Sequence, residues 1–451
     1  MLEKNQFITA EITGMTSEGN GVCKIDGMAV FVPDTAIGDK AKIKIVKVLK
    51  NYAYGIIDEI ITPSTDRIIP DCPVYKKCGG CTFRHINYKA ECQIKNNIVK
   101  DAFQRIGGIN PEFDEFISAE ETNHYRNKAQ YPLAYIDGKA ICGFYAKRTH
   151  KVIPVTDCML QPEIFRDILD TVLEYINTHK ISVYSESTNT GIMRHIYIRK
   201  GNYSQEIMLC FVVRKDVSRQ LSSLCRIVSE KFPSVKSIIM NINSDKTNVI
   251  LGQKCVTLYG NDTISDIMCG NKIEISPLSF YQVNTVQAEK IYRKALEFAS
   301  PSVNDVIADL YCGAGTIGLS MAGNAKKIIG VEVIADAIEN ARRNSIVNNI
   351  PNAEFYCGDV EEVLKNLNIY PDIIVIDPPR KGCSPETIQI IAESSPKKIV
   401  MISCNPSTAA RDVKLFSQLG YSARRVCGAD LFPHTRHVEC VVLMSRVNPK
   451  K

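Results

Sequence analysis

The sequence predicts a multidomain protein with a small all-β domain, a mixed α+β domain and a parallel α/β domain in that order. A chain of 451 residues exceeds what one hydrophobic core usually serves. Residues 1–62 contain short strands and tight turns with no helix between them. Residues 271–451 alternate strands and helices with Gly-rich turns, which predicts a doubly wound parallel sheet. We therefore expect a β-barrel at residues 1–62, a central domain at residues 63–270 and an α/β domain at residues 271–451.

The composition excludes some classes of protein and leaves others open. Hydrophobic residues make up 45% of the chain and charged residues 23%, as in globular proteins, and no apolar run is long enough to span a bilayer. The first residues lack the basic and apolar segments of a secretory signal, so we expect a cytoplasmic location and no membrane partner. In the cytoplasm the 17 cysteines serve in metal binding, catalysis or packing before disulfides. The net charge of +6 permits an anionic partner without establishing one.

Residues 1–62 are predicted to form five strands, which is typical of a small barrel of the oligonucleotide-binding kind. An Asp26-Gly27 turn joins two of them as a hairpin. Lys40, Lys42 and Lys44 alternate with apolar residues, so one face of their strand is a basic row and the other faces the core. The basic row fits an RNA surface or a solvated barrel exterior equally well. The predicted strands are Phe7–Met15, Gly21–Ile25, Met28–Val32, Lys40–Leu49 and Tyr54–Ile61.

Three short segments of this region carry a resemblance. They are Ser17–Gly21, Val32–Asp34 and Gly38–Asp39. The region is similar to the TRAM domain, an RNA-binding barrel attached to RNA-modifying enzymes. The resemblance implies RNA as a partner of the N-terminal domain.

The middle of the chain predicts a mixed α+β domain. From Tyr88 to Ile106 apolar residues recur four apart, which predicts a helix at residues 88–107 that could pack on the C-terminal domain. Four β-like runs and one further helix follow. The runs are Ala129–Tyr135, Ile192–Arg199, Ile207–Val213 and Ser237–Ile242, and the helix is Pro162–His179.

Four cysteines of the middle region form a candidate metal site. Cys72, Cys78 and Cys81 stand close together among glycines, and Cys158 follows much later. Three cysteines so spaced favour a metal over a chance core cluster. Structural zinc prefers paired knuckles, and the second pair is missing, whereas a thiolate site with one remote ligand also suits an iron–sulfur cluster. Cys92 is the rival for the fourth ligand, but its place on the predicted helix indicates packing.

A Gly-rich turn follows the first strand of the predicted α/β domain. Gly313, Gly315 and Gly318 match the pattern G-x-G-x-x-G between a strand and a helix. The next strand ends at Glu332, an acid that could hold ribose hydroxyls. Nicotinamide dinucleotides and S-adenosylmethionine both fit these features, and a tight structural turn can also produce the glycine pattern.

Acids at the next two strand ends favour S-adenosylmethionine over a dinucleotide. Asp359 ends the third strand and suits an adenine amine. Asp377 ends the fourth in an Asp-Pro-Pro segment, which resembles nucleic-acid base methyltransferases and has no role in dinucleotide dehydrogenases. Asp before Pro is also a routine turn pair, but polar residues at four successive strand ends argue against turn formation alone.

Cys404 stands where a fifth apolar strand ends in Cys-Asn-Pro, beside the expected ligand crevice. A single cysteine is usually a small buried hydrophobe, so a covalent role needs a chemical reason. C5 of uracil is not nucleophilic until a thiolate adds to C6, and a base must then remove the C5 proton. Glu439 opens the last predicted strand at the same edge of the sheet, although such a Glu is more often solvated or salt-bridged.

Six segments of the C-terminal half carry a specific resemblance. They are Ser279–Asn284, Asp309–Gly315, Val331–Glu332, Asp377–Gly382, Ser403–Pro406 and His437–Glu439. In this combination they resemble the RNA uracil-5-methyltransferase family. The resemblance implies an S-adenosylmethionine-dependent enzyme with a Rossmann-like methyltransferase domain, in which Cys404 is the nucleophile and Glu439 accepts the proton.

The resemblance also implies ligand contacts. For S-adenosylmethionine they are Gln282, Tyr311, Glu332, Asp377 and Asp359. Phe280 is implied to stack on the target base and Arg380 to orient the pocket. Members of the family with the same cysteine spacing hold a 4Fe-4S cluster, which implies a structural or RNA-positioning cluster on Cys72, Cys78, Cys81 and Cys158.

RNA is the expected substrate, and DNA is not expected. A base inside folded RNA must be everted before a thiol can reach C6, so further RNA contacts are needed. Tyr125–Lys128 and Gly191–His195 are candidates, although charged strand residues are usually just solvated. The three-domain layout resembles the ribosomal-RNA-directed branch of the family more than its smaller tRNA-directed members, which implies 23S ribosomal RNA as the target. The oligomeric state is not predicted.

Two other readings stay open. One is a non-catalytic RNA-binding iron–sulfur protein that keeps a vestigial cofactor fold. The other is an N-methyltransferase, which Asp-Pro-Pro suggests, but there the next residue is usually aromatic and here it is Arg380.

Overall fold

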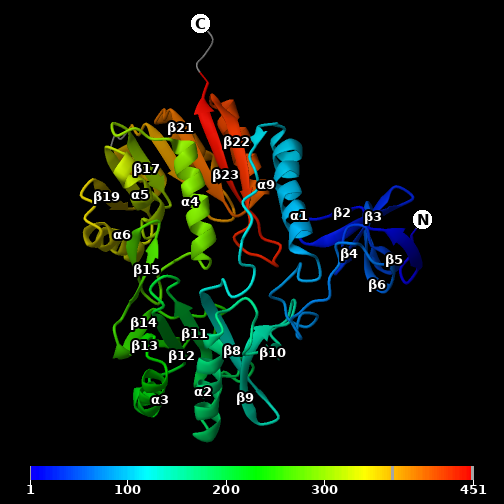
Figure 1. Cartoon of the computed structure of the whole chain (residues 1–451), viewed down its shortest axis with the longest axis vertical. Helices are drawn as coiled ribbons and strands as arrows, with labels where there is room; N and C mark the ends of the chain where they lie inside the picture. The colour runs from blue at the N-terminus through cyan, green and yellow to red at the C-terminus, as the bar shows by residue number, and fades with distance from the viewer. Residues whose placement is uncertain (1, 367–369, 448–451) are drawn as a thin grey trace.

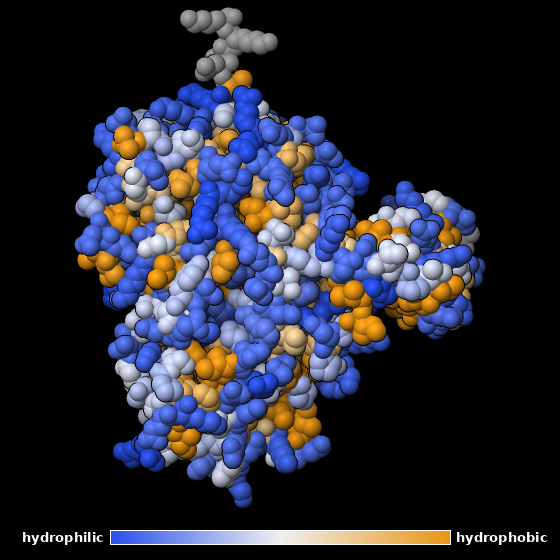
Figure 2. Space-filling view, viewed as in Figure 1, coloured by the Kyte–Doolittle hydropathy of each residue, from blue (hydrophilic) through white to orange (hydrophobic). Residues whose placement is uncertain are grey.

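The computed structural model describes residues 2–366 and 370–447 and contains three large sheets (Figure 1). The N-terminal barrel projects to one side of the molecule, and the other two sheets lie one above the other. Figure 2 shows a mainly hydrophilic face on which apolar side chains gather in small separate groups. Within the described part of the chain, no helix combines the length and apolarity needed to cross a membrane.

The N-terminal sheet closes into a barrel because its first strand is bent. β1 pairs with β5, whereas β2, which continues the same stretch of chain, pairs with β3 at the other edge. The five predicted strands are thus present, with the first divided at residues 12–13. Ala41, Ile43 and Ile45 of β5 are fully buried, and the alternating lysines lie outside. The strands are β1 (Phe7–Glu11), β2 (Gly14–Met15), β3 (Asn20–Ile25), β4 (Met28–Pro33), β5 (Lys40–Val48) and β6 (Tyr52–Thr62).

The helix predicted at residues 88–107 is an α-helix followed by a π-helical turn. α1 (Tyr88–Asp101) begins at Asn87, whose side chain accepts a hydrogen bond from the Ala90 amide. η1 (Ala102–Gly107) is π-helical, and the wider turn shifts the side-chain period. Ile106 is therefore 45% exposed, although the sequence placed it on the buried stripe. Both segments lie against the C-terminal sheet and its last helix.

The central sheet has the order β10-β9-β8-β11-β12-β13-β14. Helices α2 and α3 cover one face and complete a core with its inward side chains. The other face packs against the C-terminal region through Tyr197, Met208 and Cys210. The sequence predicted α2 but not α3. The elements are β8 (Lys128–Ile136), β9 (Lys139–Tyr145), β10 (Val152–Pro154), α2 (Ile164–Thr178), β11 (Met193–Lys200), β12 (Ile207–Val213), α3 (Ser218–Lys231), β13 (Val235–Ile242) and β14 (Lys254–Gly260).

The C-terminal sheet has the order β19-β18-β17-β20-β21-β23-β22-β7. Its strands are parallel except β23, which runs antiparallel to both neighbours. β7 joins this sheet although it comes from the middle of the sequence. The elements are β7 (Glu112–Phe113), the hairpin β15 (Ile264–Met268) and β16 (Asn271–Ile275), α4 (Thr285–Ala299), β17 (Val306–Leu310), α5 (Thr316–Met321), η2 (Ala322–Asn324), β18 (Lys327–Glu332), α6 (Ala335–Val347), β19 (Ala353–Cys357), α7 (Val360–Asn366), β20 (Ile373–Ile376), α8 (Pro385–Glu393), β21 (Lys398–Ser403), α9 (Pro406–Gln418), β22 (Tyr421–Ala429) and β23 (Glu439–Arg446).

This strand order fixes where ligands can bind. β17 and β20 are neighbours, but the chain runs from β17 outward to β19 before it returns to β20. In an open α/β sheet, the crevice outside the carboxyl ends of the strands at such a reversal is the usual ligand site. The Gly-rich turn, Asp377 and Cys404 all follow strands at this edge.

Candidate active site

Cys404 directly follows β21, and Glu439 is the first residue of the neighbouring strand β23. Ser403, the last residue of β21, pairs with Cys440 in the antiparallel ladder. One step further along this register places Cys404 across from Glu439, the first residue of β23. Residues opposite each other in such a ladder have Cα atoms about 4.5–5.5 Å apart. The thiol is half-buried, and the Glu439 side chain is 6% exposed.

The groups around the thiol act on one another electrostatically. Burial raises the pKa of Cys404 to about 11, the carboxylates of Glu439 and Asp377 add to this, and the Arg380 guanidinium opposes it. Burial also raises the pKa of Glu439 to about 8. The charge of Asp377 adds to this increase, and the charge of Arg380 opposes it. The pKa of Asp377 is raised to about 7 by burial. A thiol, two carboxyl groups and one cation therefore lie close enough to affect one another's charge.

The Gly-rich turn is held by two acids, one of which the sequence did not single out. The Asp309 carboxylate, fully buried in β17, accepts a hydrogen bond from the Gly318 amide at 2.8 Å. Burial raises the pKa of Asp309 to about 7. Glu332, at the end of β18, accepts a hydrogen bond from the Gly313 amide at 3.2 Å. Asp309 therefore fixes the start of the helix after the turn, and Glu332 fixes the turn itself.

The other predicted contacts of S-adenosylmethionine are spread around the same crevice. Tyr311 follows β17 with a left-handed φ of 64°. Burial raises the pKa of Tyr292 in α4, the charge of Asp377 adds to this, and Thr316 and Gln282 oppose it. Tyr292 therefore connects the segment before α4 to the crevice. Asn284 is a helix cap, since its side chain accepts a hydrogen bond from the Gln287 amide at 3.3 Å.

Asp359 and Phe280 are more exposed to solvent than the residues that border the crevice. Asp359 is exposed, and its carboxylate accepts a hydrogen bond from the Glu361 amide at 2.8 Å at the start of α7. Phe280 is 65% exposed and is available to a partner. Ordinary helix-end chemistry thus accounts for the position of Asp359.

The four cysteines of the candidate metal site gather in one place. Burial raises the pKa of Cys81 to about 12, Arg84 opposes this, and the thiols of Cys158 and Cys78 add to it. Burial likewise raises the pKa of Cys158 to about 11, and Cys78 and Cys72 add to it. Among the described residues, however, no three His, Cys, Asp or Glu side chains lie close enough to hold a metal ion together. The thiols are neighbours without the geometry of a single-ion site.

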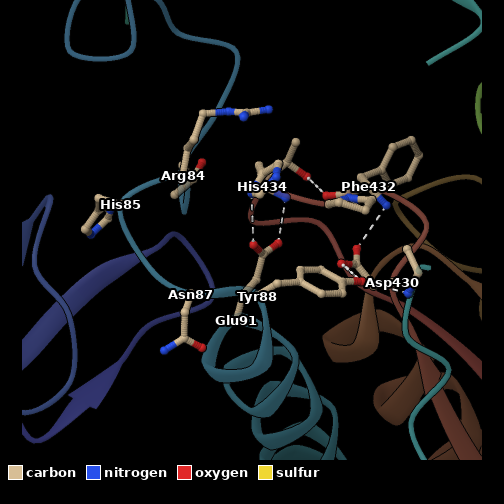
Figure 3. Close-up of polar contacts among 12 residues, drawn as sticks. Arg84, His85, Asn87, Tyr88, Glu91, Asp430, Phe432 and His434 are labelled. Carbon is tan, nitrogen blue, oxygen red and sulfur yellow. Dashed lines mark hydrogen bonds and ion pairs between the residues drawn. The ribbon is translucent and has the colours of Figure 1, made fainter. Parts of the chain in front are cut away.

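The loop between β22 and β23, which leads into Glu439, is held by buried charges (Figure 3). The Glu91 carboxylate of α1 points at His434 and accepts a hydrogen bond from its amide at 2.7 Å. Lys95, one turn further along α1, contacts Glu91 at 2.7 Å and Asp430 at 2.8 Å. The side chains of Glu91, Lys95 and Asp430 are fully inaccessible to solvent. α1 thus anchors the loop that leads to Glu439, the candidate base at the start of β23.

The same loop touches the cysteine-rich segment. The His434 carbonyl accepts hydrogen bonds from the amides of Thr82 and Phe83, at 2.8 and 3.0 Å, immediately after Cys81. Arg436 forms an ion pair with Glu18 of the barrel. The barrel, the cysteine segment and the loop before Glu439 therefore meet at one point.

Replacing Lys95 by methionine is expected to destabilise the fold by about 3–5 kcal/mol, because Glu91 and Asp430 would remain buried without their cation. Urea unfolding followed by circular dichroism measures the change. Lys89→Met alters an exposed lysine of the same helix and should change stability by less than about 0.5 kcal/mol. Equal stability of the two variants would contradict this account.

Comparison with known proteins separates the N-terminal barrel from the rest of the chain. A family model described as tRNA (Uracil-5-)-methyltransferase matches residues 87–447, and a TRAM domain model matches residues 2–57. Two curated relatives are each named "Uncharacterized RNA methyltransferase". One, from Clostridium tetani, is 40% identical over 453 residues, covering 100% of this chain and 98% of its own. The other, from Bacillus cereus, is 42% identical over 450 residues, covering 99% and 98%.

A solved structure extends the likeness to three dimensions. The crystal structure of Pyrococcus abyssi tRNA (uracil-54, C5)-methyltransferase in complex with S-adenosyl-L-homocysteine superposes with a TM-score of 0.77 at 26% identity. The match covers 97% of this chain and 100% of the other. Since the family model spans most of the chain and relatives match it from end to end, the protein belongs to the tRNA (uracil-5-)-methyltransferase family of RNA-modifying enzymes.

Proposed function

We propose that the protein transfers a methyl group from S-adenosylmethionine to C5 of a uridine in RNA through a covalent adduct on Cys404, with Glu439 as the base. The observation that carries the proposal is the register of β21 and β23, which sets the thiol across from the carboxyl group. A methyltransferase acting on nitrogen needs neither group, because a nitrogen lone pair attacks the methyl group directly.

The chain's own residues supply each step of the proposed reaction. The Cys404 thiolate forms a bond to C6, and the electrons of the C5–C6 double bond move to O4 as an enolate. The enolate re-forms its carbonyl as C5 bonds to the methyl group, and the electrons of the broken S–CH3 bond stay with sulfur in S-adenosylhomocysteine. Glu439 then removes the C5 proton, the electrons of that C–H bond restore the C5–C6 double bond, and the Cys404 thiolate leaves. Arg380 favours the thiolate at the start and end of this cycle.

The rate at which free methylated RNA forms, after elimination from Cys404, is expected to rise with pH through the neutral and mildly alkaline range. Glu439, with a pKa of about 8, accepts a proton only as the carboxylate, which predominates above that pH. The Cys404 thiol, with a pKa of about 11, is mainly protonated at neutral pH, so its thiolate fraction also grows with pH. Single-turnover rates at saturating RNA across this range measure the profile. A flat or falling profile, with RNA binding unchanged, would contradict these assignments.

S-adenosylmethionine supplies an electrophilic methyl group when it is bound. We propose that Gln282, Tyr311, Glu332, Asp377 and Asp359 contact it. Tyr311, Glu332 and Asp377 stand at the carboxyl ends of β17, β18 and β20, and Asp359 follows β19. Gln282 lies near Tyr292, as Asp377 does. The main-chain turn at Gly313–Gly318 would then approach the ligand closely. The Asp309 carboxylate holds this turn by accepting a hydrogen bond from the Gly318 amide.

Gly315→Ala is expected to weaken binding of S-adenosylhomocysteine by at least about tenfold, or about 1.4 kcal/mol. Gly315 has a φ of 77°, and a Cβ there would lie 2.9 Å from the Phe355 ring. The variant must therefore move the turn or the ring. Isothermal titration calorimetry measures the affinity. Gly323→Ala is the matched control, since a Cβ at Gly323 meets nothing within 4 Å, and an equal effect of both variants would refute the explanation.

We propose 23S ribosomal RNA as the target. The support is the combination of the TRAM barrel, the central sheet and the methyltransferase domain in one chain. Transfer RNA is the second candidate, because the Pyrococcus abyssi enzyme named for uracil-54 of tRNA matches this chain over its whole length. Methylation of separated ribosomal and transfer RNA distinguishes the two candidates. In either case we propose the cytoplasm as the compartment.

We also propose that Cys72, Cys78, Cys81 and Cys158 hold a 4Fe-4S cluster. All the donors are thiols, as such clusters require. The four ligands of a single ion lie within roughly 4 Å of one another, given metal–sulfur distances of about 2.3 Å. A cluster binds each thiolate to a different iron, which fits thiols that are neighbours without sharing one ion position. Arg84, which is 2% exposed, lies beside Cys81 and would offset negative charge there.

The test of the proposed function uses RNA from cells that lack the protein. Ribosomal and transfer RNA are separated, incubated with purified protein and S-adenosylmethionine, and digested to nucleosides. New 5-methyluridine in the 23S fraction is the expected result, whereas new 5-methyluridine only in the tRNA fraction favours the second candidate. Absence of the product from both fractions, or methylation on nitrogen, would overturn the proposal.

A further inference from the structure

A cavity of about 550 Å³ opens in the central sheet, and neither Cys404 nor Glu439 lines it. Its floor is formed by β8 and β11, where Pro132 pairs with His195. The segments 183–187 and 247–250 form its rim. A volume of this size is typical of sites for small ligands.

The walls of the cavity offer flat aromatic surfaces. The rings of Tyr145 and His150 stack with centroids 5.3 Å apart. The Arg194 guanidinium lies over the Tyr184 ring at 4.5 Å and donates hydrogen bonds to the carbonyls of Asn243, Asp245 and Thr247. Arg194 therefore stiffens the rim. Aromatic faces of this kind stack with any nucleobase, and arginine adds a cation–π contribution.

His195 provides a buried polar group without a partner. Its side chain is 9% exposed, and its Nδ1 has no hydrogen-bond partner in the described residues. Burial lowers the pKa of His195 to about 4, and the charge of Arg194 adds to this, so the ring is neutral at pH 7. A neutral imidazole nitrogen donates or accepts according to its tautomer, as the edge of a base requires. An unpaired buried polar atom is costly unless a ligand satisfies it.

The surroundings suit the backbone of a nucleic acid. Arg148 and Lys151 are exposed beside Tyr145 and His150, and neither forms an ion pair within the described chain. The one acid in the lining, Glu186, is paired with His150 at 2.9 Å. Cations without acidic partners around an aromatic cavity are the usual arrangement for single-stranded RNA.

The cavity shares a sheet face with the active-site segment. His195, Tyr197 and Arg199 alternate along β11 and so point to the same side. Arg199 donates hydrogen bonds to the carbonyls of Ser276 and Ser279, just before Phe280. His195 and Arg199 are four positions apart along the strand, which corresponds to about 13 Å. A few nucleotides of extended RNA could bridge the distance from the cavity to Phe280.

We propose that this cavity is a second nucleotide subsite, which holds an unpaired base of the RNA while another base reacts at Cys404. The inference rests on RNA being the substrate of the proposed function. It also gives a role to Arg194 and His195, which face the sheet core and the cavity and do not lie on an open basic surface. The subsite would hold the RNA strand while the target base is everted.

The experiment fills the cavity mouth and measures RNA binding. Val249 lines the rim and is 64% exposed, so Val249→Trp blocks the mouth without disturbing the core. The dissociation constant for a single-stranded random-sequence oligoribonucleotide is expected to rise about tenfold, as for the loss of one stacked base. Tyr135→Ala, which removes part of the wall, should act in the same direction. Val303→Trp, at an equally exposed site outside the cavity lining, should have no effect.

Photocrosslinking locates the contact independently of affinity. Oligoribonucleotides containing 4-thiouridine should crosslink to peptides that include Tyr135, Tyr145 or Tyr184, and Val249→Trp should abolish these crosslinks. Unchanged RNA affinity in both cavity variants, or crosslinks only elsewhere, would overturn the proposal. So would binding of free nucleoside monophosphates that Val249→Trp abolishes while RNA binding is unaffected. Adduct formation at Cys404 with saturating RNA should persist in Val249→Trp, so failure of the subsite is distinguishable from failure of the proposed function.

Discussion

Cys404→Ala is expected to eliminate methyl transfer to RNA while leaving RNA binding, S-adenosylhomocysteine binding and folding intact. Without a thiolate at C6, C5 of uracil has no route to an enolate and cannot attack a methyl group. The side chain is half-buried at the end of β21, so its truncation removes little packing. Transfer of radioactive methyl from S-adenosylmethionine to RNA measures the loss.

Cys357→Ala is the control for this variant. Cys357 is exposed at the end of β19 in the same sheet and has no role in the proposed chemistry. It should keep full activity. If Cys404→Ala retained measurable C5 methylation, the thiol would not be the nucleophile.

Glu439→Gln is expected to slow turnover by about 10²–10⁴-fold and to cause the covalent protein–RNA adduct to accumulate. Attack by Cys404 and methylation do not need the base, whereas elimination requires loss of the C5 proton. The amide is similar in size to the carboxyl group, and Glu439 is 6% exposed, so packing should be retained. Denaturing gel electrophoresis of the protein with RNA and S-adenosylmethionine reveals the adduct.

Glu393→Gln changes an exposed glutamate of the same domain and should neither slow turnover nor trap RNA. The two substitutions separate the proposed roles, because Cys404→Ala gives no adduct and Glu439→Gln gives more of it. Rapid turnover by Glu439→Gln would assign the proton to another group. Asp377 would be the first candidate, since it acts on both Cys404 and Glu439.

The family, the enzyme class and the TRAM domain predicted from the sequence are confirmed by the comparisons. Strand-end residues were predictable because parallel strands bring their carboxyl ends to one edge, whatever the details of the helices. Glu439 was placed at this edge for a different reason, because it opens the antiparallel strand β23, whose start lies beside the end of β21. The roles of the site residues and the iron–sulfur cluster stay predictions.

The buried network under the loop before Glu439 was not predicted. Glu91 and Lys95 stand four apart on a helix, a pattern usually found at solvated surfaces. Their spacing from Ile94 and Ile98 does place them on the buried stripe, and that was the available signal. Their partner Asp430 lies more than three hundred residues away, so no local pattern could reveal it.

Three other differences between the prediction and the structure have separate causes. The helix α3 buries Leu221, Leu224, Cys225 and Val228. Their spacing is helical, so the sequence does contain a signal for this helix. The two-residue strand β7 is too short to have any periodicity, and its place depends on β22. The π-helical turn η1 packs against α9, which lies far away in the sequence, so no local pattern could reveal this contact.

The covalent adduct is the central claim, and RNA that carries 5-fluorouridine tests it most directly. Fluorine at C5 has no proton for Glu439 to remove, so the reaction stops after methylation with Cys404 still bonded to C6. We predict a denaturation-resistant protein–RNA complex that requires S-adenosylmethionine, in which mass spectrometry locates the nucleotide on Cys404. Absence of any such complex with ribosomal or transfer RNA, or attachment at another residue, would contradict the mechanism.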